Sequence, residues 1–260
     1  MLRTLLIAAL LALAGCACVA RAPGAPQQAT PVRFLLSFDD GPAPSTARVL
    51  DTLASNPVQP GVKAVFFVQT RIGGETELMR RAYAEGHLLA VHSGTPRGHV
   101  SHMALSDEEL LQSLEQAKAD IAAVTGEPPR FVRPPFWFYD SGVLACYRRA
   151  GLAMVLTDVN ALDGTVLGVN VVPGKRYFIR EQLQRIKREA DERRLPRLDG
   201  VVPLIATFHD TNRWTAGDLA GYLQMLVEEA GRAGFAPAAR PFYDRREDLE
   251  RAASLRARRL

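Results

Sequence analysis

From residue 33 onward, short apolar runs alternate with amphipathic stretches along the chain. The apolar runs have the length of buried strands, and the stretches between them repeat apolar residues three and four positions apart, as one face of a helix does. Strands that alternate with helices predict a parallel sheet with helices packed against it, either open or closed into a barrel. The expected strands are 34–38, 64–68, 88–91, 131–133, 153–157 and 204–208, and the expected helices are 46–54, 75–85, 106–126, 141–150, 178–194 and 215–230.

The helix that follows Ser106 has the clearest boundaries. Ser106 and Glu109 have the spacing of a capping box, and Gly126 is a typical residue for the end of a helix. No internal repeat and no interior linker divides the chain, so we expect one domain over residues 33–240. The arginine-rich segment 241–260 is expected to be a charged C-terminal helix or a tail.

Composition and charge exclude several classes of protein. The chain has 260 residues, of which 47% are hydrophobic and 23% charged, as in an ordinary globular protein. Three cysteines cannot build a disulfide framework, so stability must come from a hydrophobic core. The 32 basic and 28 acidic residues nearly balance, and no basic stripe is interleaved with aromatic residues. We therefore expect no nucleic-acid partner.

The first residues are typical of an export signal. Arg3 precedes an apolar stretch over 5–14, which is shorter than the roughly 20 residues that span a bilayer. The sequence LAGC at 13–16 resembles the bacterial lipobox, in which cleavage precedes a cysteine that is then acylated. Residues 1–15 are thus predicted to be a lipoprotein signal peptide, Cys16 the lipidated residue and 16–32 a flexible tether, giving an exported, periplasmic or outer-membrane-anchored lipoprotein. The alternative is a plain signal peptide cut near Ala20.

Polar residues with chemical potential follow three of the expected strands. Asp39 and Asp40 follow the first, His92 and Ser93 the third, and His209 and Asp210 the strand at 204–208. Adjacent carboxylates at a strand end point to opposite sides, so one can bind a metal while the other faces a substrate. In a parallel barrel these strand ends lie at the functional edge.

Two histidines and one carboxylate form a plausible metal site. Asp40, His92 and one of His99 and His102 would make a set that suits zinc, and also iron, cobalt or nickel. Each feature also has a purely structural explanation. An Asp-Asp-Gly-Pro sequence is common in turns, and three histidines within eleven residues can occupy a solvated loop.

A resemblance along most of the chain favours the functional explanation. Five segments, in the expected order, resemble the motifs of the polysaccharide deacetylases, carbohydrate esterase family 4. They are SFDDGP at 37–42, GHLLAVHS at 86–93, VRPPF at 132–136, a divergent NALD at 160–163 and FHD at 208–210. The resemblance implies a distorted, incomplete (β/α) barrel and a metal-dependent hydrolase that acts on carbon–nitrogen bonds other than peptide bonds. Its substrate would be an N-acetylated sugar of a cell-envelope or extracellular polysaccharide.

The resemblance also implies roles for single residues. Asp39 matches the general base, Arg133 the arginine that orients the base, and His209 the general acid, with Asp163 placed to tune it. Asp40 and His92 match ligands of the metal, which is most often zinc, with cobalt or nickel as alternatives. The Phe136 N–H matches an oxyanion donor, and Trp137 stands where the family has glycine and is expected to narrow or extend the substrate cleft.

The second metal histidine is displaced from its usual position. The family places it four residues after the first, but position 96 is proline, and 94–98 resembles a three-residue insertion. Counting back from Leu105 in the family's pattern leads to His99, with His102 as the alternative.

Other departures leave the substrate open. Asn160 and Gly164 stand where the family has Asp and Trp, Asp158 competes with Asp163, and Thr207 replaces an aliphatic residue that lines the acetyl pocket. A metal-dependent amidase for a small non-sugar amide, and a catalytically silent relative that binds glycan, therefore remain as alternatives. Cys146, on an apolar helical face, is expected to be a buried, inert thiol.

Overall fold

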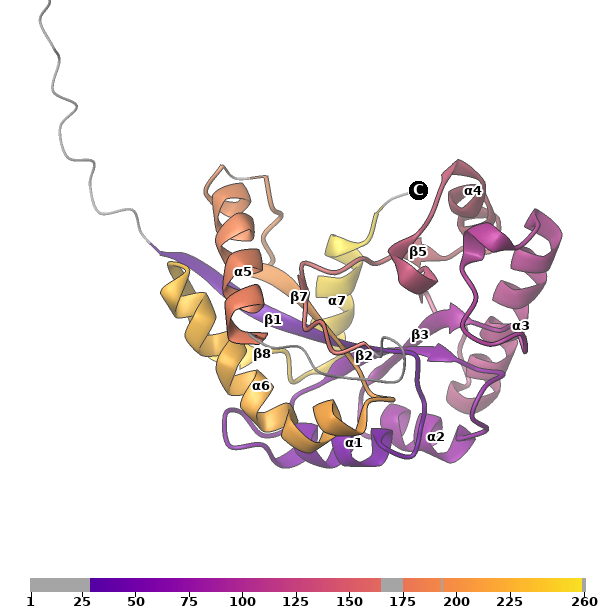
Figure 1. Cartoon of the computed structure of the whole chain (residues 1–260), viewed down its shortest axis with the longest axis horizontal. Helices are drawn as coiled ribbons and strands as arrows, with labels where there is room; N and C mark the ends of the chain where they lie inside the picture. The colour runs from indigo at the N-terminus through magenta and orange to yellow at the C-terminus, as the bar shows by residue number, and fades with distance from the viewer. Residues whose placement is uncertain (1–28, 165–174, 193, 259–260) are drawn as a thin grey trace, which may run out of the picture.

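The computed structural model describes residues 29–164, 175–192 and 194–258 (Figure 1). The predicted signal peptide, Cys16 and most of the predicted tether lie outside these residues. Within the described ranges, no helix is both long and apolar enough to cross a membrane.

The strands form one parallel sheet that curls toward closure. Its order is β5-β4-β3-β2-β1-β7-β6, and β8 pairs with the first half of β1. The two edge strands, β5 and β6, follow one another in the chain, so the sheet is an incomplete barrel of the kind the sequence predicted. The strands are β1 (Thr30–Asp39), β2 (Ala64–Gln69), β3 (Leu88–Ser93), β4 (Phe131–Val132), β5 (Ala153–Met154), β6 (Val159–Asn160), β7 (Val202–His209) and β8 (Phe235–Phe242).

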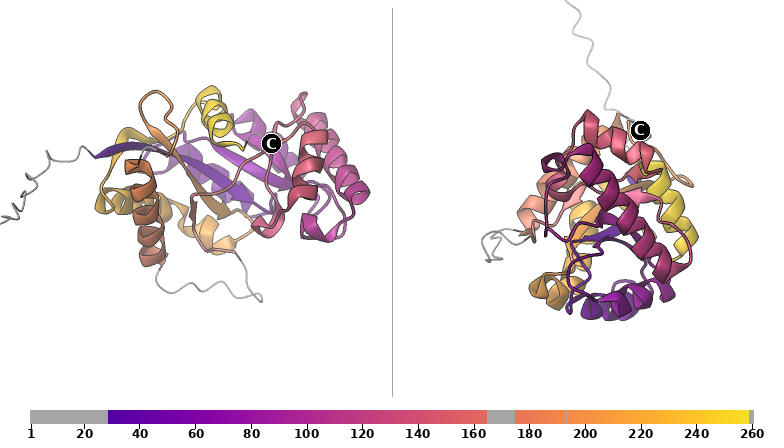
Figure 2. Two further views of the ribbon diagram at one scale, coloured as in Figure 1. Left: turned by 90° about the horizontal axis from the view of Figure 1, so that it is seen from above. Right: turned by 90° about the vertical axis from the view of Figure 1, so that its right-hand side faces the viewer.

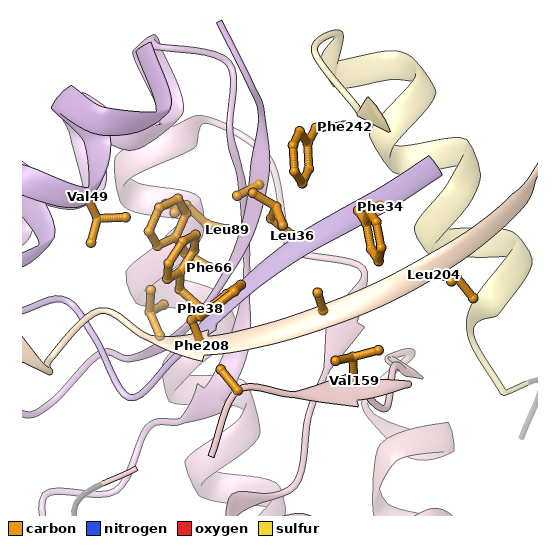
Figure 3. Packing of buried hydrophobic residues seen from close by; sticks show 14 of the residues in the cluster. Phe34, Leu36, Phe38, Val49, Phe66, Leu89, Val159, Leu204, Phe208 and Phe242 are labelled. Atoms are coloured by element: carbon orange, nitrogen blue, oxygen red, sulfur yellow. The ribbon is translucent and has the colours of Figure 1, made fainter. Parts of the chain in front are cut away.

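Alternation along β1 divides the core into two clusters. Val32, Phe34, Leu36 and Phe38 face the outer helices, where Phe38 stacks on Phe66 of β2 at a ring distance of 5.1 Å (Figure 3). The intervening side chains face the inside of the curled sheet. There Leu35 packs in a second apolar cluster, while Ser37 and Asp39 bring polar groups to the carboxyl end. The pleat of one strand thus places an apolar layer outside and a polar layer inside.

Most helices cover the outer face of the sheet. Helices α1 and α2 lie on the opposite side of the strands from α7 (Figure 1), and the end-on view shows helices arranged around the curved sheet (Figure 2). The helices are α1 (Thr46–Ser55), α2 (Thr76–Ala84), α3 (Asp107–Thr125), α4 (Ser141–Arg149), α5 (Lys175–Asp191), α6 (Arg213–Arg232) and α7 (Arg246–Arg256), with short 3₁₀ turns at η1 (His102–Ala104) and η2 (Pro135–Trp137).

The predicted capping box of α3 is present. The Ser106 side chain accepts a hydrogen bond from the Glu109 N–H, and the Glu109 carboxylate accepts one from the Ser106 N–H. Gly126 ends the helix in the left-handed conformation, with φ at 81°. Cys146 is fully buried in α4, as expected.

Both ends of the predicted domain need correction. Strand β1 begins at Thr30, because residues 30–32 pair with β7 and β8, so the predicted tether 16–32 is three residues too long. At the other end, the predicted domain limit at 240 falls inside β8, a strand that the sequence analysis missed. Of the two alternatives expected for the C-terminal segment, the structure has the helix, α7, whose Leu249, Ala252 and Ala253 are fully buried against the inner face of the sheet.

The strand expected at 153–157 was also too long. Strand β5 ends at Met154, and the next residues cross from one edge of the sheet to the other. The carbonyls of Val155 and Leu156 accept hydrogen bonds from the Arg133 guanidinium, at 3.0 and 3.4 Å, instead of continuing a strand ladder. The short β6, which pairs with β7, was not predicted.

Candidate functional site

The carboxyl ends of β1, β3 and β7 bring the predicted polar residues together. Asp39 of β1 is in direct register with His209 of β7, on one side of the central strand. Strand β3, which ends with His92 and Ser93, lies beyond β2 on the other side. Asp40 lies in the turn that directly follows β1. Its φ of 75° is a left-handed value that is uncommon outside glycine.

Asp40, His92 and His99 form a compact cluster. The Nε2 atoms of His92 and His99 each lie 3.2 Å from Asp40 Oδ1. One donor atom from each of the three residues lies within 4.8 Å of the other two, as required for residues that share one cation. The cluster is therefore a possible metal-binding triad with nitrogen and oxygen donors, a set that fits zinc, cobalt or nickel.

The groups around the triad orient its side chains and favour the protonation states that cation binding requires. His92 Nδ1 lies 2.9 Å from the Arg133 carbonyl, which accepts its proton and leaves Nε2 toward Asp40. Burial lowers the pKa of His99, which favours the neutral imidazole that a metal needs. Burial alone would raise the pKa of Asp40, but the hydrogen bond and charge of His92, with the charges of His99 and His209, lower it to about 2. Asp40 is thus ionised near neutral pH, as a metal-binding carboxylate must be.

His102, the alternative ligand, lies outside this triad. It is fully buried, and its Nδ1 is 2.6 Å from the Tyr147 hydroxyl of α4. Burial lowers the pKa of His102 to about 3, so its ring is neutral. His102 is therefore a core histidine that packs against α4.

Asp39 is held by a buried arginine. Arg133 Nη1 donates to Asp39 Oδ1 at 2.8 Å, and both side chains are almost completely shielded from solvent. The guanidinium lies between two aromatic rings, 3.9 Å from the centre of Phe67 and 5.0 Å from that of Trp137. Trp137 therefore covers Arg133, which the sequence analysis did not anticipate when it assigned Trp137 to the cleft.

A chain of hydroxyl groups, of which Ser37 and Thr207 are buried, supports the same guanidinium. Ser37 Oγ accepts from Arg133 Nη1 at 2.8 Å and lies 2.9 Å from Thr207 Oγ1, which in turn donates to Thr157 Oγ1 at 2.8 Å. Thr157 can pass its own proton to the Val159 carbonyl at 3.0 Å. Thr207 Oγ1 also lies 3.2 Å from Arg133 Nη1. Each hydroxyl thus has both a donor and an acceptor, so none is left unsatisfied.

His209 is paired with Asp163. Asp163 Oδ1 lies 2.8 Å from His209 Nδ1, while Oδ2 accepts from the His209 N–H at 3.0 Å and from the Thr215 hydroxyl at 2.6 Å. Burial opposes the charged ring, but the hydrogen bond and charge of Asp163, with those of Asp39 and Asp40, raise the pKa of His209 to about 9. His209 is therefore an imidazolium near neutral pH, with Nε2 3.9 Å from Asp40 Oδ2.

Asp158, which competed with Asp163 in the sequence, has another place. Its carboxylate accepts from the Ile205 N–H at 2.8 Å and pairs with Arg256 of α7. Asp158 thus joins α7 to the sheet and makes no contact with His209.

The aromatic residues of the third motif border the triad. Phe136 has a φ of 58° and is 46% exposed, and its ring stacks on His99 at 4.2 Å. Opposite, a Cβ on Gly164 would lie 3.4 Å from His209 Cε1. Gly164 thus lies against the His209 ring, at the position where the resemblance to the family leads us to expect tryptophan.

Sequence reasoning missed Gln69, and it named Asp210 at a strand end without giving it a role. Gln69 Nε2 donates to Asp40 Oδ1 at 3.1 Å. Asp210 is buried against Gly41, where an added Cβ would meet its carboxylate at 2.1 Å, and it accepts from the Thr46 hydroxyl at 2.5 Å. Burial raises the pKa of Asp210 to about 7. Its position next to His209 was the only signal available in the sequence.

Comparison with known proteins gives a consistent picture. The family model described as Polysaccharide deacetylase matches residues 27–155. A chitooligosaccharide deacetylase from Bradyrhizobium sp. is 37% identical over 139 residues, which cover 52% of this chain and 60% of that protein. The chain spans only part of the relatives that it matches. The match covers 44% of a chitin deacetylase from Pestalotiopsis sp., 39% of chitin deacetylase 2 from Saccharomyces cerevisiae and 60% of the Bradyrhizobium protein.

Solved structures share the fold. A family 4 carbohydrate esterase from Streptomyces lividans, in complex with acetate, has a TM-score of 0.57 and 23% identity, covering 81% of this chain and 94% of that one. A family 4 acetyl xylan esterase from Clostridium thermocellum, in complex with a cobalt ion, has a TM-score of 0.54 and 22% identity, covering 83% and 89%.

Proposed function

Because the chain belongs to the polysaccharide deacetylase family, we propose that it is a metal-dependent hydrolase that removes acetyl groups from the N-acetylated sugars of a polysaccharide. The observation that carries the proposal is the meeting of three sets of residues at the carboxyl end of the sheet. These are the ion pair of Asp39 with Arg133, the triad of two histidines and one carboxylate, and the imidazolium of His209 held by Asp163.

The triad of Asp40, His92 and His99 is proposed to hold one divalent cation, with zinc first and cobalt or nickel as alternatives. When bound, the cation lowers the pKa of water and polarises the acetyl carbonyl. The hydrogen bond from His92 to the Arg133 carbonyl supports this assignment, since such contacts orient metal-binding histidines.

Asp39 is proposed as the general base. Arg133 fixes the carboxylate through Oδ1, which leaves Oδ2 to accept the proton of the attacking water. The Phe136 N–H is proposed to donate to the oxyanion that develops on the acetyl oxygen. Trp137 stabilises the arrangement by covering the Arg133 guanidinium.

His209 is proposed as the general acid. Nδ1 is bound to Asp163, so Nε2 carries the proton that the departing sugar amine takes up. The raised pKa of His209, about 9, keeps that proton in place at neutral pH.

Acetate release from oligomers of N-acetylglucosamine, measured with and without a chelator, tests the proposal. Release that stops with chelator, returns with zinc and is lost in Asp39→Asn supports it. No release from any acetylated glycan by protein that holds stoichiometric metal would point to the amidase. Glycan binding without metal and without release would identify the silent relative.

We also propose that the enzyme is exported and anchored to the envelope through a lipid on Cys16, where its substrate would be a cell-envelope or extracellular glycan. Two lipid signals or more on one protein give stable anchoring. Cys16→Ala is expected to leave activity unchanged and release the protein from membranes. Continued membrane association of this variant would contradict the lipobox interpretation.

A further inference from the structure

A cavity lies beside the loop that joins two members of the triad. Residues 94–98 connect His92 and Ser93 to His99, and their outer side lines a cavity of about 370 Å³ against α3. Its volume falls in the range of ligand pockets, roughly 300–1,000 Å³. The segment is the insertion that the sequence analysis noted and that the proposed reaction does not use.

The loop is firmly seated on α3. Gly94 donates to the Ser113 hydroxyl at 3.0 Å, and a Cβ at position 94 would lie 2.2 Å from the Ser113 carbonyl, so only glycine fits there. Two further backbone groups bind hydroxyls within the loop, Thr95 N–H to Ser93 Oγ and Arg97 N–H to Thr95 Oγ1. The cavity therefore has a defined wall.

Part of the lining of the cavity lies at the same carboxyl end of the sheet as the triad. Arg71, one of its lining residues, follows the end of β2 by two positions, and Gln69 at that end donates to Asp40. The loop with Thr95 and Arg97 follows the end of β3 directly. The cavity and the triad are thus separated by one short loop.

Its lining combines hydrogen-bonding groups with two guanidinium groups and the carboxylate of Glu109. Gln112 and Gln116 stand one helical turn apart on α3, and Gln116 Nε2 donates to Asp120 at 2.8 Å. The remaining amide donors and acceptors match those of sugar hydroxyl and acetamido groups. Arg71 and Arg97 have side chains that are 48% and 55% exposed. Their ion pairs, to Asp120 at 3.8 Å and Glu109 at 3.1 Å, are solvated and weak, so an incoming anion can compete for them.

We propose that this cavity is a subsite for a neighbouring sugar unit that carries a carboxylate. The inference rests on the proposed function, since it assigns the cavity to another part of the same glycan. The two arginines would pair with the carboxylate, for which the planar guanidinium is the preferred partner. The glutamines would bind the hydroxyl and acetamido groups of the same unit.

The test compares neutral and acidic substrates of one length. These are a tetramer of N-acetylglucosamine, the same tetramer with one C6 oxidised to a carboxylate, and a tetramer with a lactyl ether on O3. The variants are Arg71→Gln and Arg97→Gln, with Arg148→Gln as the matched control, because Arg148 is an exposed arginine that lines a different cavity.

The expected result is a selective loss. Arg97→Gln and Arg71→Gln should raise KM for an acidic tetramer roughly tenfold, with kcat, metal affinity and the neutral tetramer unchanged, because one charge-assisted hydrogen bond is lost. Which acidic tetramer responds identifies the position of the carboxylate. If these variants change KM equally for the neutral and the acidic tetramers, or leave KM unchanged for both acidic tetramers, the subsite is overturned.

Failure of the reaction is distinguishable from failure of the subsite. If the parent releases acetate from none of the tetramers, calorimetric titration of the same tetramers still tests the cavity. Tighter binding of an acidic tetramer by the parent, lost in Arg97→Gln and retained in Arg148→Gln, supports the subsite. Equal binding of neutral and acidic tetramers by the parent overturns it.

Discussion

Arg133 Nη1 and Asp39 Oδ1 lie 2.8 Å apart inside the curled sheet, where neither side chain is more than 3% exposed. Arg133 also donates to Ser37, and to the Val155 and Leu156 carbonyls at the gap between the edge strands. Arg133 thus binds the segment that crosses the gap in the barrel, and it also fixes the carboxylate that we propose as the base. A buried charge of this kind is strongly destabilising if its partner is removed.

Substitutions of the adjacent carboxylates Asp39 and Asp40 are expected to have different effects. Asp39→Asn should abolish turnover with metal content intact, because an amide cannot accept the proton of water, whereas Asp40→Asn should lower metal affinity. Asp39→Asn should also lower the free energy of unfolding by about 3–5 kcal/mol, since the Arg133 charge loses its partner. Metal analysis, acetate release and denaturant unfolding measure the three effects. Equal loss of metal in both variants would refute the division of roles.

His209 and Asp163 are expected to set the alkaline limit of activity. His209→Ala should lower kcat by roughly 10²–10⁴-fold with metal retained, the usual contribution of a general acid. A pKa raised from 6.5 to about 9 keeps His209 protonated below pH 9, so kcat should fall as the pH rises through that value. A cation bound to Asp40 would offset part of this rise in the pKa of His209. The kcat of the metal-loaded enzyme is therefore expected to start falling below pH 9.

Asp163→Asn should move the alkaline limb of the kcat profile to lower pH, because the carboxylate that stabilises the imidazolium is gone. Asp158→Asn is the matched control, since Asp158 pairs with Arg256 and not with His209. Its profile should keep the parent's limb. A limb that stays in place in Asp163→Asn would assign the acid role to another group.

His99 and His102 are separated by metal titration. His99→Ala should weaken metal binding by an order of magnitude or more, because it removes one of three ligands. His102→Ala should leave metal affinity near that of the parent and lower stability, because a fully buried ring bonded to Tyr147 is lost. The reverse pattern would make His102 the ligand.

Thr207 is expected to act through Arg133. Thr207→Val keeps the shape but breaks the hydroxyl chain between Ser37 and Thr157, so kcat should fall roughly tenfold, with KM and metal affinity unchanged, for the loss of about one hydrogen bond. Thr207→Ser should restore most of the rate. An unaltered or faster Thr207→Val enzyme would show that the hydroxyl serves no positioning role.

Local patterns in the sequence were sufficient for much of this protein. The Ser106–Glu109 spacing predicted the start of α3, because a capping box depends on contacts within a few residues. The alternation of apolar runs and amphipathic stretches predicted the parallel sheet, because strands joined by helices pair in parallel. The ordered motifs placed Asp39, Asp40, His92 and His209 at strand ends, where β1, β3 and β7 do present them.

Tertiary structure alone decided the pairings. The sequence favoured His99 over His102 and Asp163 over Asp158 without excluding the alternatives, because each choice depends on how a loop returns to a strand distant in the chain. The hydroxyl chain through Thr207 joins three strand regions, and the burial of α7 depends on an inner sheet face that exists only after the sheet curls. Residue type and spacing reveal which groups can react, whereas packing between distant segments determines which of them meet.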